Sequence, residues 1–295
     1  MAVSRVSMRR AVRFVSWCAT AWRPSRVVGR VASSAIFRWI PRGTSARVGT
    51  EWARVIADDE RAHDVLCSGE VDVLGRMPWS SNATLLVNIT AGADELLAIY
   101  KPQRGERPLW DFPRGTLCHR EVAAYEVSAA LGWAIVPDTV LRDGPAGIGM
   151  MQRFVEHDPE EHYFTLLEEH ADAFRRMAVF DVLINNTDRK GGHCLRALAD
   201  GRIFGIDHGV SFHMQWKLRT VIWDFAGESV PPEVCADLHR FLDDLKTGGP
   251  VHDRLATLLD RFELDALRAR TEHLVATGLL PEADRDYHSY PWPTI

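Results

Sequence analysis

The sequence predicts an α+β fold in two parts, an antiparallel sheet with one helix followed by a mostly helical part. Three observations support this prediction. Between residues 71 and 154, short β-rich runs alternate with turn residues. Beyond residue 155, apolar side chains recur at the spacing of helices that bury one face. Two carboxylates in turn-forming contexts, Asp188 and Asp207, lie at the junction of these parts.

The first part contains the expected sheet. Five segments have strand character: residues 71–77, 83–89, 96–101, 136–141 and 147–154. Turn residues separate consecutive strands at 78–82, 90–95 and 142–145, so we expect antiparallel pairing. One helix is expected over residues 120–131, ended by Gly132.

The second part is expected to hold three helices and one hairpin. The helices are predicted over residues 165–184, 232–246 and 251–276. The hairpin is predicted from residues 195–198 and 202–206, joined by the turn Ala199-Asp-Gly201. This hairpin would bring Asp188 and Asp207 together at one of its ends.

The charge of the chain is unevenly distributed. Of 295 residues, 46% are hydrophobic and 25% charged, which is typical of a globular protein. Residues 1–50 hold ten arginines and no acid, whereas the rest holds 25 basic and all 40 acidic side chains. An acidic folded part argues against a nucleic-acid partner. No apolar run is long enough for a membrane span, so stable membrane insertion is not expected.

The arginine-rich leader, residues 1–50, is expected to lie outside the fold. It could be a targeting segment, a poor twin-arginine signal, or else a disordered tail or a start codon assigned too early. The five cysteines have an odd count and no CxxC spacing. This fits a cytoplasmic protein without a disulfide framework or a zinc site.

Two carboxylates brought together by a hairpin suit phosphoryl transfer. One acid, Asp188, would orient the attacking hydroxyl, and the other, Asp207, would hold magnesium against the nucleotide phosphates. Lys101 ends a strand of apolar residues, where a phosphate is a suitable partner for its charge. Glu121 and Glu126 could both pair with Lys101 from the helix. Five residues turn a helix by roughly 140°, so only one can face inward, and Glu121 is favoured.

Several motifs resemble those of known kinases. Asn186-Thr-Asp-Arg189 and Ile206-Asp-His-Gly209 are similar to the catalytic loop and the metal-binding Asp-Phe-Gly of phosphatidylinositol kinases and HipA-like kinases. Ile99-Tyr-Lys-Pro102 and Arg120-Glu-Val-Ala-Ala-Tyr125 resemble the lysine strand and helix of type II phosphatidylinositol 4-kinases. Four further segments resemble an actinobacterial family of phosphatidylinositol 3-/4-kinase-like proteins: Gly69 to Leu85, Asp188-Arg-Lys-Gly-Gly-His193, Lys217-Leu-Arg-Thr-Val-Ile-Trp223 and Tyr290-Pro-Trp-Pro293.

The resemblance implies a two-lobed protein-kinase-like fold, with a nucleotide-binding lobe over residues 58–155 and a catalytic lobe over 156–295. It implies an ATP-dependent phosphotransferase that uses Mg²⁺ or Mn²⁺ and an acceptor hydroxyl on a lipid, small molecule or protein. Asp188 would be catalytic, and Asn186 and Arg189 would brace its loop. The residues implied for ATP binding are Ser80, Ser81, Asn82, Lys101, Glu121, Gln152, Phe154 and Val155. Gln152 to Val155 would be the hinge that pairs adenine.

The chain departs from the kinase pattern at His193. Phosphatidylinositol kinases and HipA place a magnesium-binding asparagine there, whereas magnesium accepts imidazole poorly. The departure could mean that the enzyme uses manganese, uses a single metal, or has lost activity. A transition-metal site made of His193, Asp207 and His208 is an alternative.

Two questions stay open at the level of sequence. Lys217 and Arg219 could meet an anionic substrate or could be solvated charges. The function could also differ from phosphate transfer, because an ATP-binding pseudokinase that regulates a partner, or an enzyme that transfers AMP, would have a similar sequence.

Overall fold

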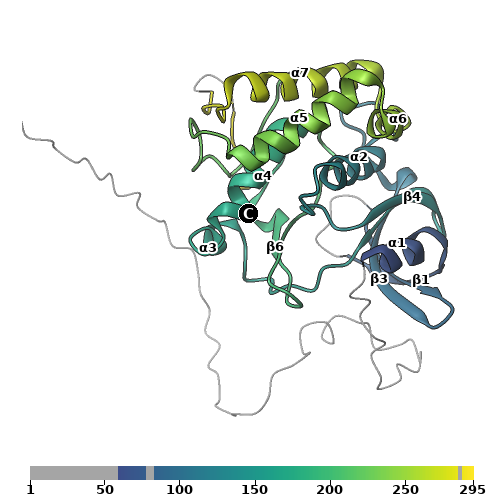
Figure 1. Ribbon diagram of the computed structural model, residues 1–295. Helices are drawn as coiled ribbons and strands as arrows, with labels where there is room; N and C mark the ends of the chain where they lie inside the picture. The colour runs from purple at the N-terminus through teal and green to yellow at the C-terminus, as the bar shows by residue number, and fades with distance from the viewer. Residues whose placement is uncertain (1–58, 78–82, 285–287) are drawn as a thin grey trace, which may run out of the picture. The chain divides into compact units, whose positions relative to one another are not determined.

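The computed structural model describes residues 59–77, 83–284 and 288–295, so predictions for the leader and for residues 80–82 lie outside it. A five-stranded antiparallel sheet of order β1-β2-β3-β5-β4 comes first, and helices follow (Figure 1). The predicted α+β class is therefore confirmed. No helix in the described part of the chain has both the length and the apolar character needed to cross a bilayer.

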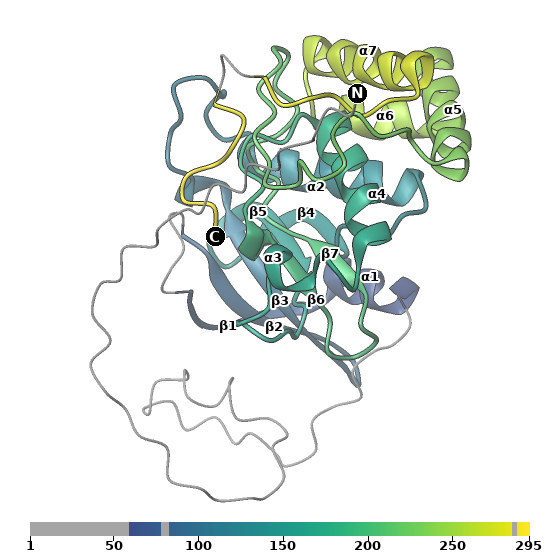
Figure 2. The same ribbon diagram turned by 90° about the vertical axis from the view of Figure 1, so that its left-hand side faces the viewer.

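In the part of the chain that the structure describes, the sheet is accompanied by two α-helices rather than one. Its elements are α1 (Asp59–Ser68), β1 (Glu70–Arg76), β2 (Leu85–Ala91), β3 (Asp94–Pro102), α2 (Leu117–Ala130), β4 (Thr139–Gly144) and β5 (Gly147–Arg153). Helix α1 was not predicted, and its Ala62, Val65 and Leu66 are buried against the sheet. Helix α2 packs on β4 and β5 and also on α6, so it connects the sheet to the helical part (Figures 1 and 2).

The hairpin between β4 and β5 is tighter than predicted. The expected turn over residues 142–145 is wrong, since Arg142 to Gly144 remain paired with β5 and Gly144 faces Gly147. The turn between β4 and β5 therefore consists of two residues, Pro145 and Ala146. Gly147 has a φ of +90°, which a glycine adopts without the steric cost that a side chain would add.

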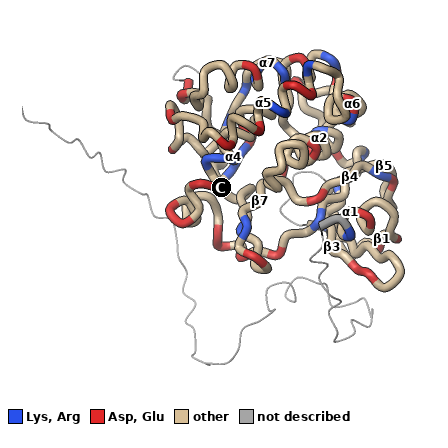
Figure 3. The backbone as a smooth tube through the Cα atoms, in the orientation of Figure 1, with Lys and Arg blue, Asp and Glu red and all other residues tan. Residues whose placement is uncertain are grey.

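The helical part contains α3 (Tyr163–Leu166), α4 (Ala171–Ile184), β6 (Cys194–Arg196), β7 (Ile203–Gly205), α5 (Pro232–Thr247), α6 (Pro250–Ala256) and α7 (Arg261–Thr277). Strands β6 and β7 pair antiparallel, as the predicted hairpin requires. Acidic and basic residues are interspersed over both parts of the described chain (Figure 3).

Two helices predicted as continuous are each divided. In place of residues 165–184, α3 and α4 are separate, and the rings of Tyr163 and Phe174 pack edge to face at 4.9 Å. In one straight helix these residues would be about 16 Å apart along the axis. In place of residues 251–276, α7 starts anew because Asp260 accepts hydrogen bonds from the backbone N–H groups of Phe262 and Glu263.

The segment 288–295 packs against the loop that follows α4. The carbonyl of Thr294 accepts a hydrogen bond of 2.7 Å from the backbone N–H of Gly191. The carbonyl of Ser289 accepts from the backbone N–H of Thr220 and from the indole N–H of Trp223. The loop over residues 186–193 is thus held from outside by a distant part of the chain.

Candidate active site

A pocket lies where β3 and α2 meet the two loops that carry Asp188 and Asp207. Its lining includes Lys101 from β3, Glu121 from α2, and both of these aspartates. Four residues separated by up to 106 positions in the chain therefore share one pocket, as the sequence motifs predict.

Lys101 joins two carboxylates across this pocket. Its Nζ lies 2.6 Å from Oε1 of Glu121 and 2.5 Å from Oδ1 of Asp207. Burial alone would lower the pKa of Lys101, but the charges of Asp207 and Glu121 outweigh it and raise that pKa well above its usual value. The ammonium is thus charged at every pH at which the protein would act.

Glu121 has a second contact that the sequence did not reveal. Its Oε2 accepts a hydrogen bond of 2.8 Å from the backbone N–H of His208. The same carboxylate therefore holds both Lys101 and the backbone directly after Asp207. Glu126, the competing candidate, faces elsewhere and pairs with Arg254 of α6 at 2.7 Å. Burial raises the pKa of Glu121, and the charge of Lys101 opposes that shift.

Asp207 is ionised and reachable. The charge of Lys101 lowers its pKa far below the usual range for a carboxyl group, and half of its side-chain surface is exposed. Its φ of +64° lies in the left-handed region, which aspartate tolerates better than most residues and which is common at functional sites. The site thus presents one ionised oxygen ligand, which fits Mg²⁺ held jointly by a carboxylate and phosphate oxygens.

Asp188 has a different environment from Asp207. Burial raises its pKa, while the charge of Lys190, whose Nζ is 3.2 Å from Oδ2, partly offsets that rise. The backbone N–H of Asp188 donates to Oδ1 of Asn186 at 3.0 Å, which fixes the start of the loop. A carboxylate with a raised pKa beside an ionised carboxylate suits a residue that accepts a proton.

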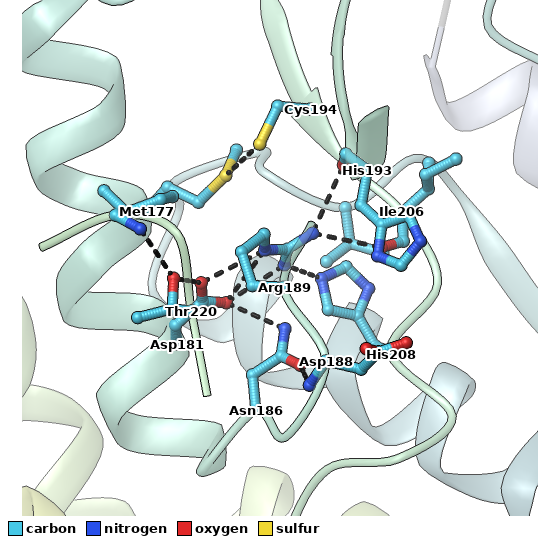
Figure 4. A network of polar contacts seen from close by, with 12 residues as sticks. Met177, Asp181, Asn186, Asp188, Arg189, His193, Cys194, Ile206, His208 and Thr220 are labelled. Atoms are coloured by element: carbon cyan, nitrogen blue, oxygen red, sulfur yellow. Dashed lines mark hydrogen bonds and ion pairs between the residues drawn. The ribbon is translucent and has the colours of Figure 1, made fainter. Parts of the chain in front are cut away.

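Arg189 is the centre of a buried network behind this pocket (Figure 4). Its guanidinium contacts both oxygens of Asp181 at 3.0–3.2 Å, and neither side chain is exposed. It also donates to the carbonyls of His193 and Ile206. A Cβ on Gly205 would approach the guanidinium to 3.2 Å, so a glycine gives it room there.

His208 belongs to this network rather than to a metal site. Its Nε2 lies 2.6 Å from Nη2 of Arg189 (Figure 4). Because a guanidinium only donates, Nε2 accepts and the ring is neutral with its proton on Nδ1. Burial and the charge of Arg189 keep the pKa of His208 well below its ordinary value.

His193 lies closer to the pocket. Its Nε2 is 3.4 Å from Oδ2 of Asp207, and burial lowers its pKa to about 4, so the imidazole is neutral near pH 7. Within residues 59–77, 83–284 and 288–295, no three His, Cys, Asp or Glu side chains are grouped to hold a metal ion. The alternative transition-metal site of His193, Asp207 and His208 is therefore wrong.

The predicted hinge is shorter than expected. Gln152 belongs to β5, where its backbone pairs with Ile99, and its side-chain amide donates to Thr139 at 2.9 Å. Of the four predicted hinge residues, only Phe154 and Val155 lie beyond the end of β5. The backbone N–H of Phe154 donates to the carbonyl of Leu97, and the Val155 side chain is buried against the β6–β7 hairpin.

Lys217 and Arg219 are not free cations at the pocket. Nζ of Lys217 pairs with Asp111 at 2.8 Å and lies 5.0 Å from the ring centroid of Trp110. The backbone of Arg219 pairs with the loop over residues 186–193, accepting from the backbone N–H of Arg189 and donating to the carbonyl of Asn186. Neither side chain lines the pocket that holds Asp188. No motif in the sequence indicated Asp111 as the partner of Lys217.

Three polar residues near the site have roles that were not predicted from the sequence. Asp181 looked like one polar position in a buried helix, although it neutralises Arg189. Glu106 accepts hydrogen bonds from the backbone N–H groups of Leu117 and Cys118 at the start of α2. Asn185 ends α4 in a left-handed conformation and donates to two carbonyls of the loop over residues 213–217. Only Asn185 had a local signal, since asparagine favours this helix-ending conformation.

Comparisons with known proteins agree with this architecture. The family described as phosphatidylinositol 3- and 4-kinase matches residues 139–266. Protein Rv2133c of Mycobacterium tuberculosis is 42% identical over 278 residues, covering 82% of this chain and 98% of that protein. The class that the family match defines is that of the kinase-like proteins. The chain belongs to the phosphatidylinositol 3- and 4-kinase-like family, together with its actinobacterial relative Rv2133c.

Solved structures with a similar course of the chain are more distant. The proinflammatory kinase CtkA of Helicobacter pylori is 14% identical, with a TM-score of 0.46 over 72% of this chain and 93% of that chain. A Golgi casein kinase is also 14% identical, with a TM-score of 0.47 over 75% of this chain and 76% of that chain.

Proposed function

We propose that the protein is an ATP-dependent phosphotransferase that moves the γ-phosphate to an acceptor hydroxyl. One observation carries this proposal: Lys101, Glu121 and Asp207 meet within 2.6 Å in a pocket that Asp188 also lines. A scaffold protein would not need a second carboxylate of raised pKa beside the ionised one.

Each residue of the pocket would have a distinct role in phosphate transfer. Lys101 would bind the nucleotide phosphates, and Glu121 would keep its ammonium in place. Asp207 would hold Mg²⁺ or Mn²⁺, which neutralises phosphate charge when bound. Asp188 would orient the acceptor hydroxyl and take its proton, while Asn186 and Arg189 fix the loop. The backbone at Phe154 and Val155 would face adenine.

The chain organisation proposed with this function has three parts. Residues 58–155 would form the nucleotide-binding lobe and residues 156–295 the catalytic lobe. Residues 1–50 would be dispensable for folding, because their ten arginines have no acid among them. A chain starting at Glu51 should then melt at the same temperature as the full chain.

The test separates binding from chemistry. Calorimetry with ATP and Mg²⁺ or Mn²⁺ should show weaker binding for Lys101→Ala and Asp207→Ala, with unchanged circular dichroism. Asp188→Asn should keep ATP affinity, while transfer of labelled phosphate into protein, lipid or metabolite fractions falls by about 10²–10⁴. Asp200→Asn, an acid-to-amide change in the exposed β6–β7 turn, is the matched control.

Three outcomes would overturn parts of the proposal. Unchanged ATP affinity in both pocket variants would refute the nucleotide site. Tight ATP binding without transfer to any acceptor would favour the pseudokinase alternative. Label from the α-phosphate appearing on the acceptor would instead indicate AMP transfer.

A further inference from the structure

Helix α2 is tied to the helical part by a buried ion pair next to Glu121. Nη2 of Arg120 contacts Oε1 of Glu263 in the first turn of α7, 143 positions away. The side chains are only 1% and 9% exposed. Consecutive residues of a helix point about 100° apart, so Arg120 can reach α7 while Glu121 faces Lys101.

Both partners of this pair are constrained. Oε2 of Glu263 accepts the backbone N–H of Asp260 at 3.0 Å, which fixes the carboxylate to the start of its own helix. The guanidinium of Arg120 lies 5.0 Å from the ring centroid of Phe112. In the described part of the chain, Nε and Nη1 of Arg120 have no hydrogen-bond partner. The buried guanidinium therefore depends on Glu263, and separating the two would leave an uncompensated charge.

The position of α2 decides the geometry of the pocket. Glu121 holds Lys101 on one oxygen and the backbone N–H of His208 on the other. A shift of α2 large enough to release Lys101 would also separate Arg120 from Glu263. We propose that Arg120 and Glu263 are positioning residues, which hold α2 where Glu121 can place Lys101 for ATP. This inference rests on the nucleotide-binding role proposed for Lys101.

The chain offers a matched control on the same helix. Glu126 of α2 pairs with Arg254 of α6, and the Arg254 side chain is 49% exposed. The Glu126 side chain is 20% exposed, so water reaches and screens this pair far more than the buried one, and the pair contributes less. Removing it should leave the position of α2 unchanged.

Two cysteines allow the position of α2 to be measured without any catalytic assay. Cys118 lies in α2, is 2% exposed and lines the pocket; burial raises its pKa to about 12. Cys194 lies in β6, is fully buried, and has a pKa raised by burial to about 12 as well. The alkylation rate of each thiol reports how often its surroundings open.

The experiment compares full-chain variants without nucleotide, with alkylation at each cysteine followed by peptide mass spectrometry. In Arg120→Met and in the milder Glu263→Gln, Cys118 should react at least about tenfold faster while Cys194 keeps its rate. Arg120→Lys should restore part of the protection, and Arg254→Gln should behave as wild type. ATP affinity should fall in the first two variants only.

The outcomes separate this inference from the proposed function. Unchanged protection of Cys118 in both variants would overturn it. Equal acceleration of Cys118 and Cys194 would also overturn it, because the pair would then stabilise the protein as a whole. A wild type that binds no ATP would refute the proposed function, and the thiol rates would still decide whether the pair holds α2.

Discussion

Two groups of charged side chains, close together in the fold, differ in how they use their charges. The group in the pocket joins Lys101 to Glu121 and Asp207, and half of the Asp207 side-chain surface is exposed. The group behind it joins Arg189 to Asp181 and His208, with no exposed surface on the ion pair. Both are compact, but only the first can exchange a partner for a ligand.

The difference shows which charges are available for chemistry. The Asp181 oxygens accept hydrogen bonds from Arg189, Asn186 and Thr220, so this carboxylate is fully occupied. Asp207 has Lys101 on one oxygen, and the neutral ring of His193 lies 3.4 Å from the other. The buried group therefore fixes the geometry of the loops. The pocket group, in contrast, keeps a carboxylate that a ligand could reach.

The largest effect should come from breaking the buried group. Asp181→Ala leaves the guanidinium of Arg189 buried without its carboxylate, which should lower the free energy of unfolding by about 3–5 kcal/mol. Equilibrium unfolding in denaturant measures this difference in the free energy of unfolding. Asp172→Ala, which removes a fully exposed partner of Arg175 on the same helix, should leave stability unchanged. Equal stability in the two variants would contradict the comparison.

A smaller loss of stability is expected in the pocket group. Lys101→Met should lower the free energy of unfolding by about 1–3 kcal/mol, because Glu121 can take up a proton and Asp207 reaches water. Burial already raises the pKa of Glu121, and losing Lys101 raises it further. The variant should therefore be close to wild type at low pH and lose stability as pH rises through that pKa. Urea unfolding at several pH values would show a loss independent of pH if this account is wrong.

The choice of metal should change with the residue beside Asp207. His193→Asn replaces a neutral imidazole by an amide oxygen, a donor that Mg²⁺ prefers. Activity with Mg²⁺ relative to Mn²⁺ should rise by about tenfold, measured as phosphate transfer in parallel titrations of both metals. A ratio equal to that of wild type would place His193 outside the metal environment.

The smallest effect concerns the pH dependence of turnover. Asp188 must be ionised to accept a proton, and burial has raised its pKa, so activity should fall as pH drops through that raised value. The charge of Lys190 partly counteracts the rise. Lys190→Met should therefore move the acidic limb of the profile to higher pH. A limb that stays in place or moves to lower pH would contradict the role of Asp188.

The sequence predicted the fold class from local signals. It predicted the pocket because the segments that carry its four residues each resemble a kinase motif. Alternating apolar residues indicated the strands, and the helix angle between Glu121 and Glu126 showed that only one of them can face Lys101. The partners of Arg189, Arg120 and Lys217 could not be predicted, since they lie in elements brought close only by packing. The two divided helices differ in the same way. The break before α7 could have been predicted, because Asp260 and Glu263 form a local capping box. The break before α4 could not, because the contact of Tyr163 with Phe174 arises from packing.

The contact between Thr294 and Gly191 has a consequence for synthesis of the chain. Gly191 leaves the ribosome about a hundred residues before Thr294, as the numbering shows, so the loop over residues 186–193 is made long before its outer support. Because domains are assembled as the chain emerges, the helices of the described residues, all of which end by Thr277, can form before this loop is held. A nascent chain would thus acquire its core first, and the loop that carries Asp188 would gain the support of Thr294 last.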